Sequence, residues 1–372
     1  MKKVLIVFGT RPEAIKMSPL VKEFLLNSDQ FETKVCVTAQ HREMLDQVLE
    51  FFEIIPEFDL NLMKEGQNLF TLTADVIVSM KPVLEAFRPD YVFVHGDTTT
   101  STAAALASFY AGAKICHVEA GLRTHNKLSP FPEEINRQIT GRLADIHFAP
   151  TEQAKQNLLN EGINQECIFV TGNTVIDALM WAKEKLESYD DAEILFLNKI
   201  INFDKKIILV TGHRRENFGE GFLNICNALL ETAQREDVEI IYPVHLNPQV
   251  QKPVYDILSN HPNIKLIKPM TYPAFVWLMN KSYVILTDSG GVQEEAPSLG
   301  KPVLVMRDTT ERPEAVDAGT VKLVGTNKEC IIEQLEQLLN NEEMYYTMSR
   351  SNNPYGDGLS SSKIVSILKV NE

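Results

Sequence analysis

The sequence predicts an α/β protein built from two doubly wound, Rossmann-like domains. Short apolar runs rich in valine and isoleucine alternate with helix-length amphipathic stretches, and the runs lack apolar–polar alternation. Strands buried on both faces of a parallel sheet have this pattern. The alternation repeats in the second half of the chain, which indicates a second sheet of the same kind. We expect the two domains to face each other across a cleft at the carboxyl ends of their strands, where ligands bind.

The expected elements of the first half are short strands separated by longer helices. Its strands are Val4–Phe8, Lys34–Thr38, Tyr91–Val94, Lys114–Val118 and Ile168–Val170. The helices between them include Pro12–Leu26, Leu69–Phe87, Thr100–Tyr110 and Thr151–Glu161. The expected strands of the second half are Ile207–Val210, Glu239–Tyr242, Ile264–Ile267, Val284–Leu286 and Val303–Val305.

The domain boundary is expected near the charged segment Glu187–Lys206, which we interpret as a linker and the entry to the second domain. This places an N-terminal domain at residues 1–185 and a C-terminal domain at residues 186–355. The last helix, Ser361–Lys369, follows a turn cluster. We expect residues 356–372 to pack back on the first domain.

Composition and charge exclude several classes of function. The 372 residues carry a net charge of −14 and no long basic run, which argues against a nucleic-acid or anionic-membrane partner. The five cysteines form no CxxC pair, so a metal–thiolate site is not indicated and a reducing, cytoplasmic location fits best. No stretch approaches the ~18 apolar residues that a membrane span requires.

Polar clusters follow the expected strands of the first half. After Val4–Phe8, the segment Gly9–Lys16 places Arg11 and Lys16 at a helix start, where backbone N–H groups favour anions. A solvated Lys16 is the structural alternative. The spacing is not that of a nucleoside-triphosphate loop.

Three carboxylates of the first half are candidate functional residues. Asp97 follows a strand, although it is also placed to cap the next helix. Glu119 ends an apolar strand, where a carboxylate is costly unless it is paired or lies in a cleft; an ion pair with Arg123 is the alternative. Glu133 begins a helix after two prolines that would hold it rigidly, although acids also suit that position because of the helix dipole.

Two clusters of the second half predict a phosphate site. His213, Arg214 and Arg215 follow a strand, or are simply surface charges on a loop. The segment Leu286–Glu295 contains Ser289, Gly290 and Gly291 at a helix start, where bare amides would approach a pyrophosphate, and Glu295 one turn later would accept from a ribose diol. A glycine turn with an aspartate cap is the alternative. The histidines lack metal-ligand spacing and no GxGxxG motif occurs, so neither a metal nor a nicotinamide cofactor is indicated.

Taken together, these clusters resemble the non-hydrolysing UDP-N-acetylglucosamine 2-epimerases of bacteria. The matching segments cover nearly the whole chain and include GTRPEAIKMSPL, QHREMLDQVL, VHGDTTT, HVEAGLRT, PEEINRQ, VTGNTVIDAL, VTGHRREN, YPVHLNP, TDSGGVQEEAPSLGKPVLVMRDTTERPEA and NPYGDG. The resemblance implies a GT-B-like fold, a homodimer, no redox cofactor, and conversion of UDP-GlcNAc to UDP-ManNAc with UDP retained during turnover.

The resemblance also implies roles for individual residues. The residues implied to bind the substrate are Arg11, Lys16, Asp97, Glu119, His213, Phe275, Ser289, Gly290, Gly291, Glu295 and Arg312. Among them, Arg312 would join the diphosphate and Phe275 would lie against the uracil. The implied catalytic residues are Asp97, Glu119, Glu133 and His213. A second, regulatory UDP-GlcNAc site would use Gln40, His41, Gln47, Glu134, Arg214 and His245. However, Gly66 stands where allosteric Gram-positive members carry an arginine, which argues against allosteric activation.

The proton on sugar carbon 2 is not adjacent to a carbonyl, so its direct removal is very difficult. We therefore hypothesise that UDP is eliminated first, giving 2-acetamidoglucal, and is then added back on the inverted centre. Cations and helix-end amides would stabilise the leaving diphosphate, and separate acid–base groups would move the proton. A GT-B glycosyltransferase, a hydrolysing epimerase and an inactive nucleotide-sugar sensor remain alternatives.

Overall fold

The computed structural model describes residues 1–38, 42–62, 64 and 66–370. Its contacts divide the chain into two compact units. Unit 1 comprises Met1–Trp181 and Tyr355–Glu372, and unit 2 comprises Ala182–Pro354. The chain leaves unit 1 inside helix α7 (Thr174–Lys185) and returns between Pro354 and Tyr355.

Unit 1 is built on a parallel sheet that, within the described residues, has seven strands in the order β3-β2-β1-β4-β5-β6-β7. The strands are β1 (Lys2–Phe8), β2 (Phe31–Val37), β3 (Phe58–Asp59), β4 (Tyr91–His95), β5 (Lys114–Val118), β6 (Ile146–Ala149) and β7 (Ile168–Val170). The strand order reverses between β1 and β4, which pair in parallel. In an open sheet of this kind, that reversal marks the crevice in which ligands bind.

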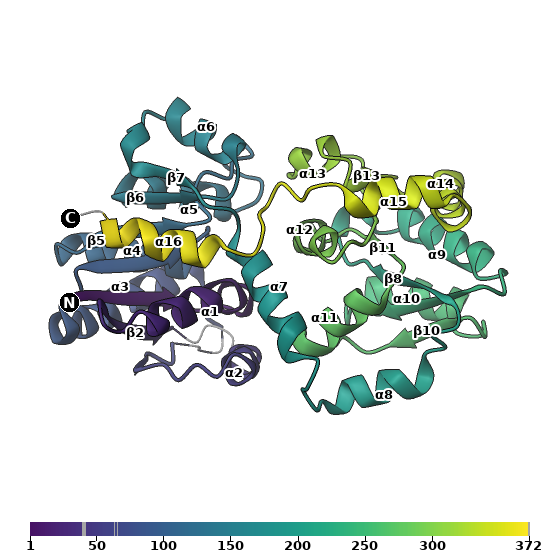
Figure 1. Ribbon diagram of the computed structural model, residues 1–372, viewed down its shortest axis with the longest axis horizontal. Coiled ribbons are helices and arrows are strands. Elements are labelled where there is room, and N and C mark those ends of the chain that lie inside the picture. The colour runs from purple at the N-terminus through teal and green to yellow at the C-terminus, as the bar shows by residue number, and fades with distance from the viewer. Residues whose placement is uncertain (39–41, 63, 65, 371–372) are drawn as a thin grey trace. The chain divides into compact units, whose positions relative to one another are not determined.

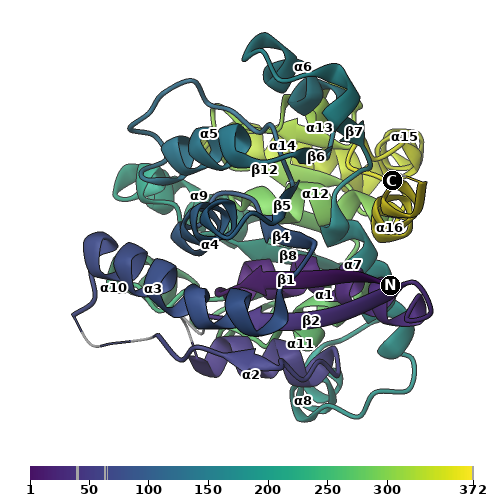
Figure 2. The ribbon, with the colours of Figure 1, turned by 90° about the vertical axis from the view of Figure 1, so that its left-hand side faces the viewer.

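Helices cover both faces of the unit 1 sheet (Figure 2). They are α1 (Arg11–Leu26), α2 (Arg42–Phe51), α3 (Leu69–Phe87), α4 (Thr99–Tyr110), α5 (Glu133–Leu143), α6 (Glu152–Asn160), α7 and α16 (Ser360–Val370), with a 3₁₀ turn at Gln165–Cys167. Helices α3, α4 and α5 contact one another on one face, while α1 contacts α2 and α16 on the other. Figure 1 shows α16 beside α1, and Lys2 Nζ donates to the carbonyl of Leu368 at 2.7 Å.

Unit 2 repeats the same winding. Within the described residues it has a six-stranded parallel sheet in the order β10-β9-β8-β11-β12-β13. The strands are β8 (Lys206–Thr211), β9 (Val238–Pro243), β10 (Ile264–Ile267), β11 (Val284–Thr287), β12 (Val303–Val305) and β13 (Val321–Leu323). The helices are α8 (Ala192–Ile200), α9 (Glu220–Thr232), α10 (Pro248–Leu258), α11 (Tyr272–Lys281), α12 (Gly290–Ser298), α13 (Pro313–Asp317), α14 (Lys328–Asn340) and α15 (Glu342–Arg350), with a 3₁₀ turn at Arg215–Asn217.

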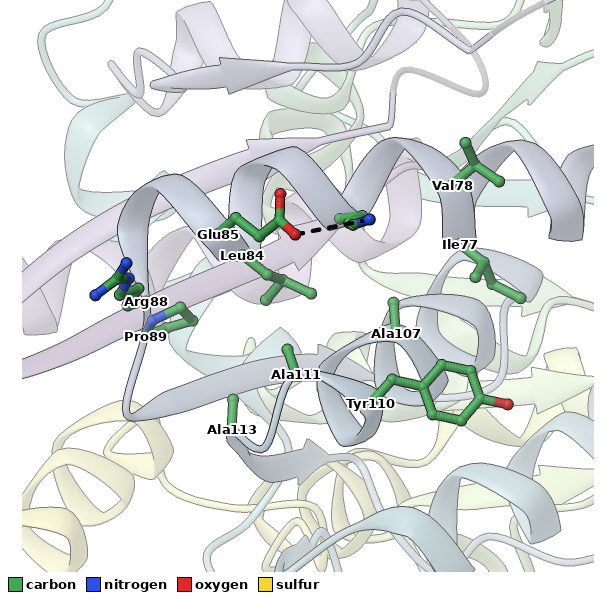
Figure 3. A pocket seen from close by; sticks show the side chains of 11 residues that line it. Ile77, Val78, Leu84, Glu85, Arg88, Pro89, Ala107, Tyr110, Ala111 and Ala113 are labelled. Carbon is green, nitrogen blue, oxygen red and sulfur yellow. Dashed lines mark ion pairs between the residues drawn. The ribbon is translucent and has the colours of Figure 1, made fainter.

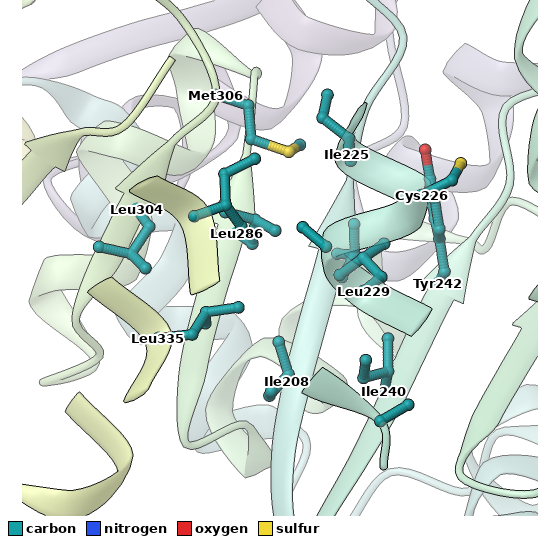
Figure 4. Close-up of a cluster of buried hydrophobic side chains, with 14 of the residues drawn as sticks. Ile208, Ile225, Cys226, Leu229, Ile240, Tyr242, Leu286, Leu304, Met306 and Leu335 are labelled. Carbon is teal, nitrogen blue, oxygen red and sulfur yellow. The ribbon is translucent and has the colours of Figure 1, made fainter. Parts of the chain in front are cut away.

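A buried cluster joins the unit 2 sheet to helices α9, α10, α14 and α15 (Figure 4). Ile208 and Ile240 project from neighbouring strands toward Leu229 of α9, and Leu335 of α14 packs into the same cluster. All four side chains are completely buried. Burying a side chain of this size contributes roughly 1.5–3 kcal/mol to the free energy of unfolding, so this cluster stabilises the arrangement of the unit 2 strands.

The prediction of two doubly wound α/β sheets is confirmed, and the expected strands occur within a few residues of their predicted bounds. Helix α8 occupies much of the segment interpreted as a linker and the entry to the second domain, and this helix belongs to unit 2. The carboxylate of Asp191 caps this helix, accepting from the N–H groups of Glu193 and Ile194 at 2.8 and 3.0 Å. Over the described residues, no helix is both long and apolar enough to cross a membrane.

Candidate active site

The sequence-predicted site residues of unit 1 gather behind the carboxyl ends of β1, β4 and β5. A buried carboxylate, that of Glu13 in the first turn of α1, ties two of these strand ends together. One oxygen accepts from the N–H groups of Gly9 and Thr10 at 3.1 and 2.8 Å. The other accepts from the hydroxyls of Thr98 and Ser101 at 2.6 and 3.0 Å. Glu13 therefore fixes the loop after β1 against the loop after β4.

Glu119 lies at the end of β5 in a left-handed backbone conformation, with φ of +60°. Such a conformation is strained for a residue with a side chain and persists only where the surroundings enforce it. Its Oε2 forms an ion pair with Lys16 of α1 and accepts from Asn173 Nδ2 at 2.8 Å. The alternative expected from the sequence, an ion pair between Glu119 and Arg123, does not form, because Arg123 binds Glu161 at 2.7 Å.

Charge and hydrogen bonds together keep Glu119 ionised. Burial alone would raise the pKa of this carboxyl. The charge of Lys16, and the hydrogen bonds from Lys16 and Asn173, instead hold the pKa of Glu119 well below its usual range. The sequence alone did not identify Asn173 as part of this cluster.

His95 is the other buried group next to Glu119. Its Nε2 lies 3.7 Å from Glu119 Oε2 and makes no hydrogen bond within the described part of the chain. Burial lowers the pKa of His95, although the nearby carboxylate of Glu119 opposes this effect. A neutral imidazole is therefore the favoured form at this position.

Asp97 is held by an arginine rather than used as a helix cap. Thr98 caps α4, accepting from the N–H of Ser101 at 3.0 Å. The Oδ2 of Asp97 lies 2.6 Å from Arg137 Nη2 and accepts from Arg137 Nε at 2.9 Å. Asn136 Nδ2 donates to the Asp97 carbonyl at 2.9 Å. Helix α5 thus sets both the backbone and the side chain of Asp97.

The two adjacent acids that begin α5 differ in their surroundings. Glu133 is half-buried and makes no hydrogen bond or ion pair with any described residue. Glu134 is completely buried, and its oxygens accept from the N–H groups of Thr124 and His125 at 3.0 and 3.1 Å and from Arg137 at 3.2 Å. Burial would raise the pKa of Glu134, but these donors hold it below its usual value. Its oxygens are therefore occupied in positioning the loop before α5.

In unit 2, the loops after β8 and β11 meet at a buried carboxylate. Asp288 is completely buried, and its Oδ2 accepts from the N–H groups of His213 and Arg214, both at 2.8 Å. Its Oδ1 lies 3.5 Å from His213 Nδ1. The His213 ring stacks on His245, with centroids 5.3 Å apart. Burial lowers the pKa of His213, while Asp288 opposes the shift.

The start of α12 brings Ser289, Gly290, Gly291 and Arg312 together. A Cβ on Gly290 would lie 2.5 Å from Arg312 Nη1, so the missing side chain is what allows the guanidinium to lie against the helix. Arg312 Nε is held by Glu294 Oε1 at 2.6 Å. A Cβ on Gly291 would lie 3.3 Å from Glu295 Oε1. Amides and a cation at one helix end form a suitable site for a diphosphate.

The remaining predicted residues are more scattered. Arg11 begins α1 and makes no hydrogen bond or ion pair with a described residue; burial lowers its pKa. Phe275 is half-buried in the first turn of α11, and Gln47 is exposed on α2. Arg214 has a buried Nε that makes no hydrogen bond in the described structure. Gln40 and His41 lie outside the described residues. No group of three or more described His, Cys, Asp or Glu side chains is arranged to hold a metal ion.

A groove of about 630 Å³ between α3 and α4 lies apart from these residues (Figure 3). Its wall is mostly apolar and includes Ile77, Leu84 and Ala107, with Tyr110 at its edge. It contains none of the sequence-predicted site residues.

Two doubly wound parallel sheets, each with charged residues at the carboxyl ends of its strands, define an α/β protein of the GT-B-like class. A model of the family described as UDP-N-acetylglucosamine 2-epimerase matches residues 24–369. The chain belongs to this family, as the motif resemblance predicted.

Curated and solved relatives agree with this assignment. The chain is 59% identical to the UDP-N-acetylglucosamine 2-epimerase of Escherichia coli O157:H7, with 99% of each protein covered. It is similar to the crystal structure of the Neisseria meningitidis UDP-GlcNAc 2-epimerase bound to UDP-GlcNAc, with a TM-score of 0.88, 54% identity, and 99% and 100% of the two chains covered. A putative UDP-N-acetylglucosamine 2-epimerase from Listeria monocytogenes gives a TM-score of 0.92 at 51% identity, with 99% and 96% covered.

Proposed function

We propose that this chain interconverts UDP-GlcNAc and UDP-ManNAc by inverting carbon 2 of the sugar. Family membership supports the reaction. The structural observation that carries the proposal is the state of Glu119, a buried carboxylate kept ionised by Lys16 and Asn173. Moving a proton to and from a carbon atom needs acid–base groups of this kind, and Asp97, held by Arg137, supplies a second carboxylate.

The diphosphate is assigned to a set of N–H donors, some neutral and some cationic. In unit 2 these are the amides at Ser289–Gly291, together with Arg312 and His213. In unit 1 they are Arg11 and Lys16. Negative charge develops on the diphosphate as the anomeric C–O bond breaks, and preorganised donors stabilise that charge most effectively. Phe275 would contact the uracil and Glu295 the ribose.

The chemistry proceeds in two half-reactions. In the first, the anomeric C–O bond breaks, UDP leaves with the bonding electrons, and a carboxylate takes the proton from carbon 2, which leaves 2-acetamidoglucal. In the second, UDP adds back to carbon 1 while a proton is delivered to the opposite face of carbon 2. Two acid–base groups on opposite faces of the sugar are therefore needed. Asp97, Glu119 and Glu133 supply the candidates.

Lys16 links substrate binding to basicity in this scheme. A carboxylate whose pKa is held so low is a weak base, because catalytic pKa values work best near the operating pH. An anionic diphosphate that attracts Lys16 would weaken the ion pair with Glu119. The pKa of Glu119 would then rise toward the working range while the substrate is bound.

Proton NMR of the pure protein with UDP-GlcNAc alone tests the function. The proposal predicts UDP-ManNAc and an equilibrium mixture that is also reached from UDP-ManNAc. Free ManNAc plus UDP would instead identify a hydrolysing enzyme. Turnover that appears only when a sugar acceptor is added would identify a glycosyltransferase, and tight binding without any product would identify a sensor.

Three further expectations accompany this proposal: a homodimer, a cytoplasmic location, and retention of UDP during turnover. Light scattering of the purified protein tests the first. Radiolabelled UDP added during turnover tests the third, since retained UDP exchanges with the labelled pool much more slowly than the sugar inverts.

A further inference from the structure

The segments Gly172–Asn173 and Tyr355–Ser361 pack against each other, and Asn173 contacts Glu119. We propose that Asn173 is a positioning residue for Glu119, and that the segment Asn353–Ser361 holds Asn173 in that position. The inference rests on the role of Glu119 in the proposed function.

Asn173 is buried and fixed at three of its polar groups. Its Nδ2 donates to Glu119 Oε2 at 2.8 Å, and its Oδ1 accepts from the N–H of Val175 at 3.1 Å. Its own backbone N–H donates to the carbonyl of Tyr355 at 2.7 Å. Because Oδ1 is engaged at the start of α7, the amide presents its donor side to Glu119.

The C-terminal segment that returns from unit 2 packs closely against Gly172. Gly172 has φ of +90°, and a Cβ there would lie 2.7 Å from Ser360 Oγ and 3.2 Å from the Tyr355 carbonyl. On the opposite side, the carboxylate of Asp177 accepts from the N–H groups of Ser360 and Ser361 at 3.2 and 2.6 Å. Asp177 thus secures the start of α16, and the returning segment cannot shift without disturbing the Tyr355 carbonyl that holds Asn173.

The same segment is anchored in unit 2 two residues earlier. Asn353 Nδ2 donates to the carbonyl of Glu294 at 2.7 Å and to Ser298 Oγ at 2.6 Å, both on α12. Helix α12 carries the amides that we assign to the diphosphate. Within three residues the chain is therefore bound first to α12 and then to Asn173. Only Pro354, whose ring restricts its backbone, lies between the two anchors.

The decisive variants are Asn173→Ala and Asn173→Asp, assayed for kcat and KM as a function of pH. Asn173→Ala removes the donor, and kcat should fall by about 10- to 100-fold with KM within a few-fold, because Glu119 loses orientation rather than contact with substrate. Asn173→Asp keeps an oxygen that accepts from the N–H of Val175, but it places a second carboxylate next to that of Glu119. The charged and titratable groups facing Glu119 are otherwise Lys16 and His95.

Asn173→Asp should show a new alkaline limb. At low pH the two carboxyls share a proton, the new group donates to Glu119, and activity exceeds that of Asn173→Ala. As pH rises the second proton leaves, the like charges repel, and activity falls to that of Asn173→Ala or below. Near-normal activity of Asn173→Asp at every pH would overturn the inference, since it would mean that only the bond to Val175 matters.

Gly172→Ala and Asp177→Asn test the contribution of the returning segment. Both should lower kcat in the same way as Asn173→Ala, and Asp177→Asn combined with Asn173→Ala should cost less than the two separate effects multiplied together. Gly162→Ala is the matched control, because Gly162 has φ of +78° and nothing within 4 Å of its Cβ position. Equal losses in Gly162→Ala and Gly172→Ala, or full additivity in the double variant, would exclude this contribution.

A titration that needs no turnover separates this inference from the proposed function. Carboxyl ¹³C NMR, with the Glu119 signal assigned by its loss in Glu119→Gln, should show a coupled, shifted titration in Asn173→Asp. If the parent chain fails to epimerise while this signal shifts, the function falls and the positioning role stands. If the parent chain epimerises and the Glu119 signal is unaffected, the positioning role is wrong.

Discussion

The guanidinium group of Arg137 lies 2.6 Å from the carboxylate of Asp97, across 40 residues of sequence. A second nitrogen of the same group lies 2.9 Å from the same oxygen. This ion pair fixes the direction of the Asp97 side chain, which does not cap helix α4. The carboxylates of unit 1 are therefore held by different partners, Asp97 by Arg137 and Glu119 by Lys16.

Replacing Arg137 with lysine should impair turnover without abolishing binding. A lysine retains the charge but cannot reproduce the fork that contacts both Asp97 and Glu134. We expect kcat to fall by roughly 10- to 100-fold with little change in KM. Steady-state kinetics with UDP-GlcNAc measures this, with the exposed Arg142→Lys on the same helix as control. Equal behaviour of the two variants would remove Arg137 from the site.

Replacing Gly290 with alanine should weaken nucleotide binding. The new Cβ would lie 2.5 Å from Arg312 Nη1 and displace the guanidinium from the start of α12. Loss of one charge-assisted contact costs about 1.5–3 kcal/mol, so UDP affinity should fall about tenfold or more. Calorimetric titration with UDP measures this. Gly221→Ala is the control because its Cβ would meet Thr326 at an ordinary 3.4 Å; unchanged affinity in Gly290→Ala would contradict the assignment.

Replacing Glu13 with glutamine should destabilise unit 1. The carboxylate accepts from four donors, whereas an amide would turn its own N–H₂ group toward two of them. The free energy of unfolding should fall by about 2–4 kcal/mol, because buried donors lose their acceptor. Urea denaturation compares it with Glu23→Gln farther along α1. A change below 0.5 kcal/mol, taken as a rough threshold for ordinary surface substitutions, would show that the network matters little.

His117 should make unit 1 less stable as pH falls. Its buried ring donates from Nε2 to the Gly96 carbonyl at 2.7 Å, and burial lowers the pKa of His117 to about 3. The unfolded chain takes up a proton near pH 6.5, while the folded chain does not until about pH 3. Stability is therefore fully present above pH 6.5 and lost below it. Between pH 7 and 5 the loss is about 2 kcal/mol.

Denaturation of the parent chain and of His117→Gln at pH 7 and pH 5 measures this contribution. The glutamine can still donate to Gly96 but has no proton to take up, so its pH dependence should be shallower. His125→Gln, on a nearby loop, should retain the slope of the parent chain. Equal slopes for the parent chain and His117→Gln would refute the prediction.

The sheets were predictable because buried parallel strands leave a direct signature in the sequence. Runs such as Lys114–Val118 and Ile264–Ile267 match the observed strands residue for residue. Strands β3, β6 and β13 were not anticipated, since none of them is a continuous run rich in valine and isoleucine. Helix α8 was not anticipated within the segment interpreted as a linker and domain entry, where Asp191 is its cap.

Candidate site residues could be proposed from the sequence where one side chain follows one strand, and partners were missed where two distant segments cooperate. Asn173 and Glu119 are 54 residues apart, and Asp288 reaches the His213 loop across 75. A local sequence pattern does not predict contacts between residues so far apart in the chain. Glu13 is an exception, because Thr10 and Glu13 form a capping box whose threonine–x–x–glutamate spacing is visible in the sequence.

In the proposed mechanism, carbon 2 loses its proton to the protein during inversion, and turnover in deuterated water measures this step. UDP-ManNAc formed from UDP-GlcNAc should carry solvent deuterium at carbon 2, and UDP-GlcNAc recovered at equilibrium should carry it too. Product that keeps the original hydrogen at carbon 2 would exclude this mechanism, because the proton would then never have reached a group of the protein that exchanges with water.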